Sequence, residues 1–160
     1  ELGAAIVNDT GGLQDPEMVS LVAEANAIAI AMHLEGATTP LAVGELALDD
    51  NKAERMAEAF EHRLAELADA GIDQTILDPG IGITYATDYD EVTRQQLRVV
   101  TGLGAIGRLG PVLLPVPRKK EPARVAAFIT LAIEHGADVI RVHDVEAACD
   151  LVRLFDRAAA

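Results

Sequence analysis

The chain has 160 residues, of which 50% are hydrophobic and 24% are charged, and its formal net charge is −13. This length and apolar content suit one globular domain with a single core. The acidic excess disfavours general attraction to nucleic acid or anionic lipid, and the longest apolar run, 27–32, is far below the ~20 residues of a membrane-spanning helix. We therefore expect neither nucleic acid nor a membrane as a partner.

Cys149 is the only cysteine, and the first residues resemble neither a signal peptide nor a transit segment. An internal disulfide is excluded, which suits a reducing compartment, so we expect a cytoplasmic protein. We expect Cys149 to be a small buried helix residue rather than a reactive thiol.

Five short apolar runs alternate with helical segments, and each run ends in polar residues. In chain order they are 4–7 with Asn8 and Asp9, 27–32 with His33, 75–77 with Asp78, 112–116 with Arg118 and Lys119, and 138–142 with Arg141, His143 and Asp144. Strands that alternate with helices predict parallel pairing. All five polar clusters should then lie at one edge of the sheet, where α/β barrels build their active sites.

Helix signals stand between these runs. Asp15 offers an N-cap and Pro16 a first-turn residue for a helix over 17–25. Further helices are predicted from Asp49 to a stop at Gly71, over 88 to about 103, from 121 to 136 and over 146–157. Residues 1–9 and 134–144 repeat one pattern of helix end, glycine, apolar strand and terminal aspartate, which supports repeated βα units.

Five such units do not close an eight-stranded barrel, and an open arc of five strands leaves two parallel edges. The pattern alone therefore allows two α/β folds. One is an open doubly wound sheet, and the other is a partial barrel of five parallel strands with flanking helices.

Two of the strand ends carry the clearest candidate site residues. Arg141 and His143 are two residues apart, so on a strand their side chains share a face, and the pair suits a diphosphate. The alternative is an ion pair between the arginine and an aspartate, beside a satisfied histidine. Asp78 is either a ligand-binding carboxylate or the first residue of an Asp-Pro-Gly turn.

The strand ends also carry a resemblance, in order along the chain. Residues 3–9, Met32 with His33, residues 77–83 (Leu-Asp-Pro-Gly-Ile-Gly-Ile), residues 111–119 and residues 140–144 (Ile-Arg-Val-His-Asp) resemble the fourth to eighth strands of dihydropteroate synthase, a pterin-binding family. The family fold is a (β/α)₈ TIM barrel. The resemblance implies that residues 1–160 form one pterin-binding domain that lacks the first three βα units, as a truncated or divergent member.

The resemblance implies a transferase of folate biosynthesis, which condenses 6-hydroxymethyl-7,8-dihydropterin diphosphate with p-aminobenzoate and releases pyrophosphate. Asp78 would accept two N–H groups of the pterin edge, and Asn8 would match its mixed donors and acceptors. Arg141 and His143 would hold the leaving pyrophosphate. The implied catalytic residues are Lys119, Arg141 and His143, and the implied substrate-binding residues are Asn8, Met32, Asp78, Ile83, Lys119, Arg141 and His143.

The resemblance implies no tightly bound cofactor, although Mg²⁺ can accompany the diphosphate. The four histidines show no metal-ligand spacing, so we expect no metal held by the protein. The family often dimerises through its last helices, which places 125–133 and 148–155 in a homodimer interface.

The chain departs from the family pattern at two places. Pro117 and Lys120 replace the serines of a usual Ser-Arg-Lys-Ser, and residues 84–89 replace a usual lysine and a His-Asn pair. We therefore expect this chain alone to be inactive. Two alternatives stay open, a non-catalytic pterin- or phosphate-binding barrel relative and a methyltetrahydrofolate-dependent methyltransferase; Arg141 with His143 argues against the second.

Overall fold

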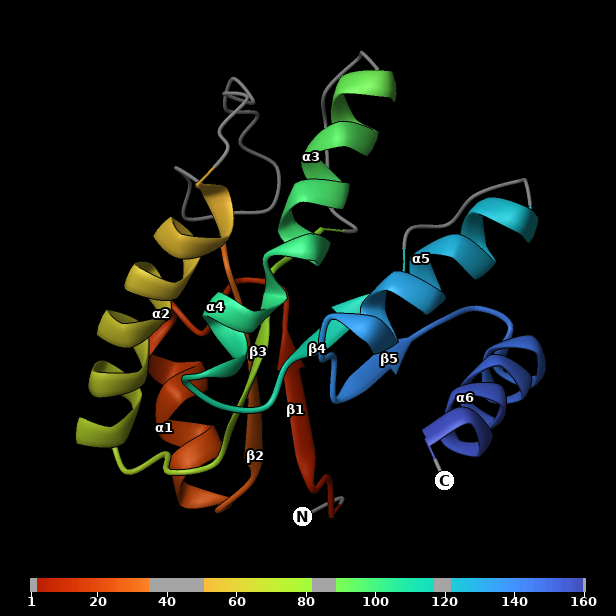
Figure 1. Cartoon of the computed structure of the whole chain (residues 1–160). Coiled ribbons are helices and arrows are strands. Elements are labelled where there is room, and N and C mark those ends of the chain that lie inside the picture. Colours follow the sequence, from red (N-terminus) through yellow and green to blue (C-terminus); the bar gives the residue numbers. More distant parts are fainter. Residues whose placement is uncertain (1–2, 35–50, 82–88, 117–121, 160) are drawn as a thin grey trace.

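The structure is a computed structural model that describes residues 3–34, 51–81, 89–116 and 122–159 (Figure 1). Its strands are β1 (Ile6–Asp9), β2 (Ile28–Met32), β3 (Thr75–Asp78), β4 (Leu113–Pro115) and β5 (Val139–Arg141). Its helices are α1 (Pro16–Glu24), α2 (Lys52–Asp69), α3 (Tyr89–Thr101), α4 (Leu103–Gly107), α5 (Pro122–Glu134) and α6 (Val145–Ala159). The predicted alternation of strands and helices is confirmed.

The five strands are parallel and neighbour one another in chain order. β1, β2 and β3 form one sheet, and β4 pairs with β5 in a second. In the described part of the chain, one parallel bridge between Leu77 and Val112 joins the two sheets, next to a hydrogen bond of 2.8 Å from the Leu77 N–H to the Pro111 carbonyl.

This order decides between the two folds that the sequence allowed. A doubly wound sheet reverses its strand order at a switch point, whereas here each strand lies beside its predecessor. The helices also follow in series, since α2 packs on α3, α3 on α5 and α5 on α6. The described strands and helices form a partial barrel.

Local sequence explains where several helices begin and end. The Asp15 carboxylate accepts the Glu17 N–H at 2.9 Å and caps α1 as predicted. The predicted helix from 88 to 103 is interrupted at Gly102, after which α4 begins. A Cβ on Gly102 would lie 2.5 Å from the Cβ of Ala53, so the glycine lets α2 approach closely. The predicted start at Asp49 lies outside the described residues.

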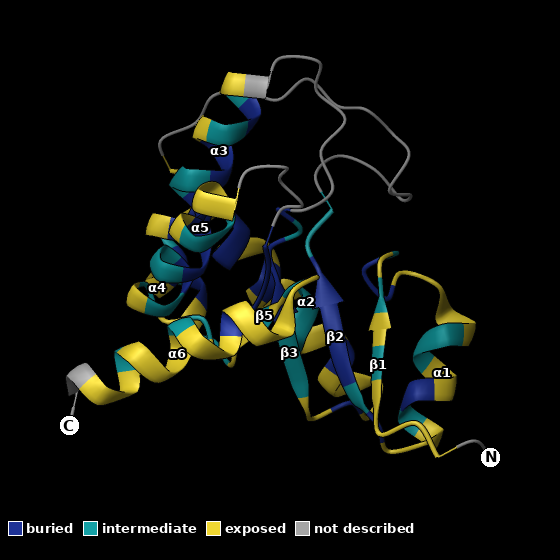
Figure 2. Cartoon of the chain, turned by 90° about the vertical axis from the view of Figure 1, so that its right-hand side faces the viewer, coloured by how far each residue is buried: buried dark blue, intermediate teal, exposed yellow. Residues whose placement is uncertain are grey.

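Burial differs across the strands (Figure 2). β2 is buried along most of its length, while β1 and β5 alternate between exposed and half-buried residues. The main core includes Met56, Phe60, Val100 and Phe128. The described helices include none with the length and apolar character needed to cross a membrane.

One expectation about α6 is wrong. Cys149 is exposed. The helix packs on α5 and buries Ala148, while the next residue along the helix, Cys149, is turned about 100° away from that face. Val152, on the same helix, is 36% exposed.

Candidate functional site

Asp78 ends β3 and is the most buried ionisable side chain among the described residues of the candidate site. Its accessibility is 0%. One carboxylate oxygen, Oδ1, accepts the Gly80 N–H at 2.7 Å. The other, Oδ2, is buried and has no hydrogen-bond partner among the described residues. The turn therefore uses one oxygen of Asp78 and leaves the second one to accept a donor from elsewhere.

The electrostatics of Asp78 connect β3 with β5. Burial raises the pKa of the Asp78 carboxyl from 3.8 to about 6, while the hydrogen bond from Gly80 and the Arg141 guanidinium each lower it. Arg141 ends β5, so its charge acts on a carboxylate that ends β3. The two residues lie at the same edge of the sheet, as the parallel arrangement requires.

The ends of β1, β2 and β3 fit closely together at that edge. Gly80 has φ +70° and Gly12 has φ +68°. A Cβ on Gly80 would lie 2.8 Å from the His33 carbonyl oxygen, and one on Gly12 would lie 2.8 Å from the Met32 carbonyl oxygen. The His33 N–H donates to the Asp78 carbonyl at 2.8 Å. The end of β2 is thus enclosed by the turns after both neighbouring strands.

Met32 and His33 occupy this enclosed strand end. Met32 is buried and pairs in register with Asp78. The His33 ring meets Phe60 of α2 edge-on, with ring centroids 5.9 Å apart. Met32 therefore lies beside Asp78, whereas the His33 ring contacts Phe60, a residue of the main core.

Asn8 and Asp9 end β1, and the structure separates their roles. Asp9 accepts the Gly11 N–H at 2.9 Å through Oδ1 and the Leu13 N–H at 2.8 Å through Oδ2. Successive strand residues point to opposite faces, and Asn8 is exposed. Asp9 shapes the turn, and Asn8 is the residue of the pair that is accessible to a ligand.

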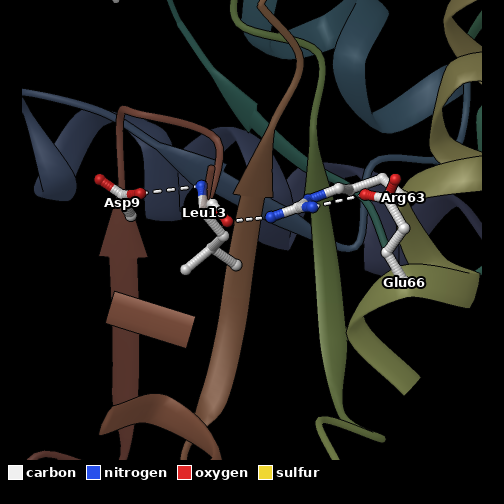
Figure 3. A network of polar contacts seen from close by, with 4 residues as sticks. All are labelled: Asp9, Leu13, Arg63 and Glu66. Carbon is white, nitrogen blue, oxygen red and sulfur yellow. Dashed lines mark hydrogen bonds and ion pairs between the residues drawn. The ribbon is translucent and has the colours of Figure 1, made fainter. Parts of the chain in front are cut away.

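Arg63 of α2 fixes the same turn from the other side (Figure 3). Its guanidinium donates to the Leu13 carbonyl and pairs with Glu66 at 2.5 Å. Leu13 is fully buried and has φ +58°, a conformation that leucine rarely adopts. Sequence reasoning did not identify Arg63, because nothing in a helical Arg-x-x-Glu pair indicates a partner fifty residues away.

Arg141 and His143 are both exposed, and they are not on one strand. β5 ends at Arg141, and His143 lies in a bend beyond it, so strand alternation does not place their side chains on one face. The Asp144 carboxylate accepts the Ala147 N–H at 3.1 Å and caps the start of α6. Within the described residues Arg141 forms no ion pair, so the alternative pairing with an aspartate is not observed.

The predicted site residues divide into three groups. Met32, Asp78 and Arg141 lie at one edge of the sheet, with Asn8 at the end of the strand beside β2. The structure shows His143 two residues beyond Arg141. Lys119 and Ile83 lie outside the described residues. Across the described ranges, no three His, Cys, Asp or Glu side chains gather where they could hold a metal ion.

Comparison with known proteins identifies the family. Residues 1–143 match the model of the family described as pterin binding enzyme. Dihydropteroate synthase of Bacillus subtilis is 31% identical over 169 residues, covering 96% of this chain and 54% of that protein. The enzyme of Mycobacterium leprae is 35% identical over 176 residues, covering 95% and 59%. The chain spans about half the length of the curated relatives it matches.

Solved structures agree with the fold. Dihydropteroate synthase from Thermus thermophilus aligns with a TM-score of 0.83 and 27% identity, over 99% of this chain and 66% of that one. The same enzyme in complex with 4-aminobenzoate aligns with a TM-score of 0.81 and 27% identity, over 97% and 63%. These enzymes are TIM barrels, which confirms the predicted partial (β/α)₈ architecture. By sequence and by fold, the chain belongs to the pterin-binding enzyme family.

Proposed function

We propose that the protein is a dihydropteroate synthase, which condenses 6-hydroxymethyl-7,8-dihydropterin diphosphate with p-aminobenzoate. The observation that carries this proposal is the Asp78 carboxylate, buried at a strand end with Oδ2 unpartnered among the described residues and a cation, Arg141, nearby. Relatives of this chain are dihydropteroate synthases, and structures of the Thermus thermophilus enzyme contain 6HMPPP or 4-aminobenzoate.

Asp78 suits the edge of a pterin ring, which presents an amino group next to a ring N–H. A carboxylate can accept both through charge-assisted hydrogen bonds. Because its pKa is about 6, Asp78 is mostly ionised at neutral pH and able to accept. The N–H groups of the ring would thereby donate to Oδ2, which is buried and has no other donor among the described residues. Asn8 and Met32 would contact the same ring from the neighbouring strand ends, and Lys119 and Ile83 complete the proposed set.

The reaction would break the bond between the pterin methylene carbon and the diphosphate oxygen, with the electron pair leaving on the diphosphate. The amine nitrogen of p-aminobenzoate would then attack the methylene carbon and lose a proton. Arg141 and His143 would stabilise the charge on the leaving group, which is electrostatic catalysis by groups already in place. No covalent intermediate on the protein is needed. The described residues offer no cluster of His, Cys, Asp or Glu side chains that would hold Mg²⁺ beside the diphosphate.

The wider organisation is part of the same proposal. Residues 1–160 would act as one pterin-binding domain that supplies five of the eight barrel strands, inactive as an isolated chain. We also propose a cytoplasmic homodimer through 125–133 and 148–155. The exposed apolar side chains of Val152 and Leu154 on α6 support that interface.

The test uses the full-length protein with a pterin diphosphate and p-aminobenzoate, and it measures pyrophosphate release and pterin affinity. We expect condensation, and we expect Arg141→Gln to weaken binding of the pterin diphosphate more than binding of a pterin without diphosphate. Arg108→Gln removes the same charge from an exposed pair with Glu61 of α2 and serves as the control. Absence of affinity for the pterin diphosphate would refute the proposal, while affinity without condensation would identify the non-catalytic relative instead.

A further inference from the structure

We propose that Gln96 of α3 is a positioning residue, which holds the turn after β3 so that the Asp78 carboxylate keeps its orientation toward the ligand. This inference rests on the proposed function. Gln96 Nε2 donates to the Ile81 carbonyl oxygen at 2.7 Å, and both residues are buried. The hydrogen bond ties a helix to the turn that begins at Asp78.

The turn is restrained at three points. Asp78 Oδ1 holds the Gly80 N–H, the Asp78 carbonyl holds the His33 N–H, and Ile81 is held by Gln96. Gly80, directly before Ile81, has no room to move toward β2, because even a Cβ there would lie 2.8 Å from the His33 carbonyl. A shift at Ile81 would therefore act on Gly80 and on the hydrogen bond that Gly80 makes to Asp78.

Helix packing alone does not account for a glutamine at this position. Gln96 lies on the inward face of α3 with Val92, Val99 and Val100, which are buried and apolar. Its Oε1 is buried and has no partner among the described residues, an arrangement that is unfavourable for a polar atom. An apolar side chain would avoid that penalty, but it would leave the Ile81 carbonyl without its donor.

The charge of Asp78 depends on the geometry of this turn. The Gly80 hydrogen bond favours the ionised carboxylate. If Gln96 fixes the turn, its loss should weaken that bond and raise the pKa of Asp78. The charged group that acts on Asp78 from the adjoining sheet is Arg141, and His33 adjoins it through the backbone, so neither is altered directly by a change at Gln96.

The test compares full-length Gln96→Met with the unchanged protein. The pKa of Asp78 is measured by NMR titration of its carboxyl carbon without ligand, and pterin affinity is measured against pH. We expect an upward shift of the pKa and an affinity at pH 7 lower by about tenfold, the size of one hydrogen bond. Val100→Ala thins the same helix face and removes no hydrogen bond, so it should lower Tm without moving the pKa.

A second variant keeps the test decisive if Gln96→Met does not fold. Gln96→Leu carries neither a donor nor a charge, so it also removes the hydrogen bond to the Ile81 carbonyl and should shift the pKa in the same direction. An unchanged pKa and unchanged affinity in the folded variants would overturn the inference and leave the proposed function intact. A shifted pKa in a protein that binds no pterin would overturn the proposed function and support the positioning role.

Discussion

The turns after β1 and β3 begin with the same hydrogen bond but differ in the second oxygen of the aspartate carboxylate. In each, an aspartate at the strand end accepts the N–H of a glycine two residues later, Asp9 from Gly11 at 2.9 Å and Asp78 from Gly80 at 2.7 Å. The second oxygen of Asp9 accepts the Leu13 N–H at 2.8 Å, whereas that of Asp78 is buried with no partner in the described chain. One carboxylate completes its turn, and the other keeps an unused acceptor.

The comparison separates a structural aspartate from a ligand-binding one by their hydrogen bonds alone. A carboxylate whose acceptors are all satisfied within the turn stabilises the fold. A carboxylate that is desolvated and only half satisfied is destabilising until a ligand donates to it. The following variants test whether this difference is real.

The largest effect is expected for Asp78→Asn. Its side-chain oxygen can still accept the Gly80 N–H, but its amide donates where the pterin also donates. Two charge-assisted hydrogen bonds are lost, each worth about 1.5–3 kcal/mol, so affinity for the pterin should fall about 1000-fold. Isothermal titration calorimetry would measure this change. An affinity within tenfold of the unchanged protein would show that Asp78 does not bind the ring.

The pH dependence of folding should reveal the same carboxyl without a ligand. The pKa of Asp78 rises from 3.8 to about 6 on folding, so the folded state disfavours the ionised form. The contribution of Asp78 to the free energy of unfolding should therefore increase as pH falls through this range, by about 3 kcal/mol in all between pH well above 6 and pH well below 4.

Denaturant unfolding at pH 7 and pH 5 would measure this, with Asp78→Asn as the reference that carries no carboxyl. As pH falls, the unfolding free energy of the unchanged protein should increase relative to that of Asp78→Asn. Parallel curves would mean that the Asp78 carboxyl is not desolvated.

Asp9→Asn should give the reverse of Asp78→Asn. The turn after β1 would lose one accepted N–H, because an amide cannot accept through both of its ends. The free energy of unfolding should fall by about 2 kcal/mol, while pterin affinity changes less than it does in Asp78→Asn. Thermal unfolding would measure the stability of both variants, and calorimetry would measure their pterin affinity. Similar losses of affinity in the two would contradict the assignment of Asp9 as structural and Asp78 as ligand-binding.

The smallest effect is expected at Arg63. Arg63→Met would leave the Leu13 carbonyl without its guanidinium donor and lower the free energy of unfolding by about 1 kcal/mol. Glu66→Gln removes only the exposed ion pair and should change stability by less than ~0.5 kcal/mol. Equal effects of the two changes would assign the contribution of Arg63 to the ion pair instead of the turn.

Much of the architecture could be predicted from the sequence, because apolar runs and helix caps are local signals. Asp15 capped α1 as expected, and all five strands overlap their predicted runs. The sequence could not decide whether Asp78 forms a turn or binds a ligand, because the two roles use different oxygens of one carboxylate. Oδ1 accepts the Gly80 N–H of the turn, and Oδ2 has no partner in the described chain. Its burial depends on neighbours from other strands. His143 lies beyond the end of β5, next to Asp144, which caps α6. Gln96 could not be identified from the sequence because its hydrogen-bond partner, Ile81, lies fifteen residues earlier, in the turn after β3.

The narrow connection between the two sheets has a mechanical consequence. One bridge, Leu77 to Val112, joins β3 to β4, with Asp78 on one side of it and Arg141 on the other. A rigid molecule bound to both Asp78 and Arg141 would cross the connection between the two sheets. It would therefore restrict twisting of one sheet against the other. Hydrogen exchange at the Leu77 amide should then slow when such a molecule is bound, even though Leu77 itself touches none of it.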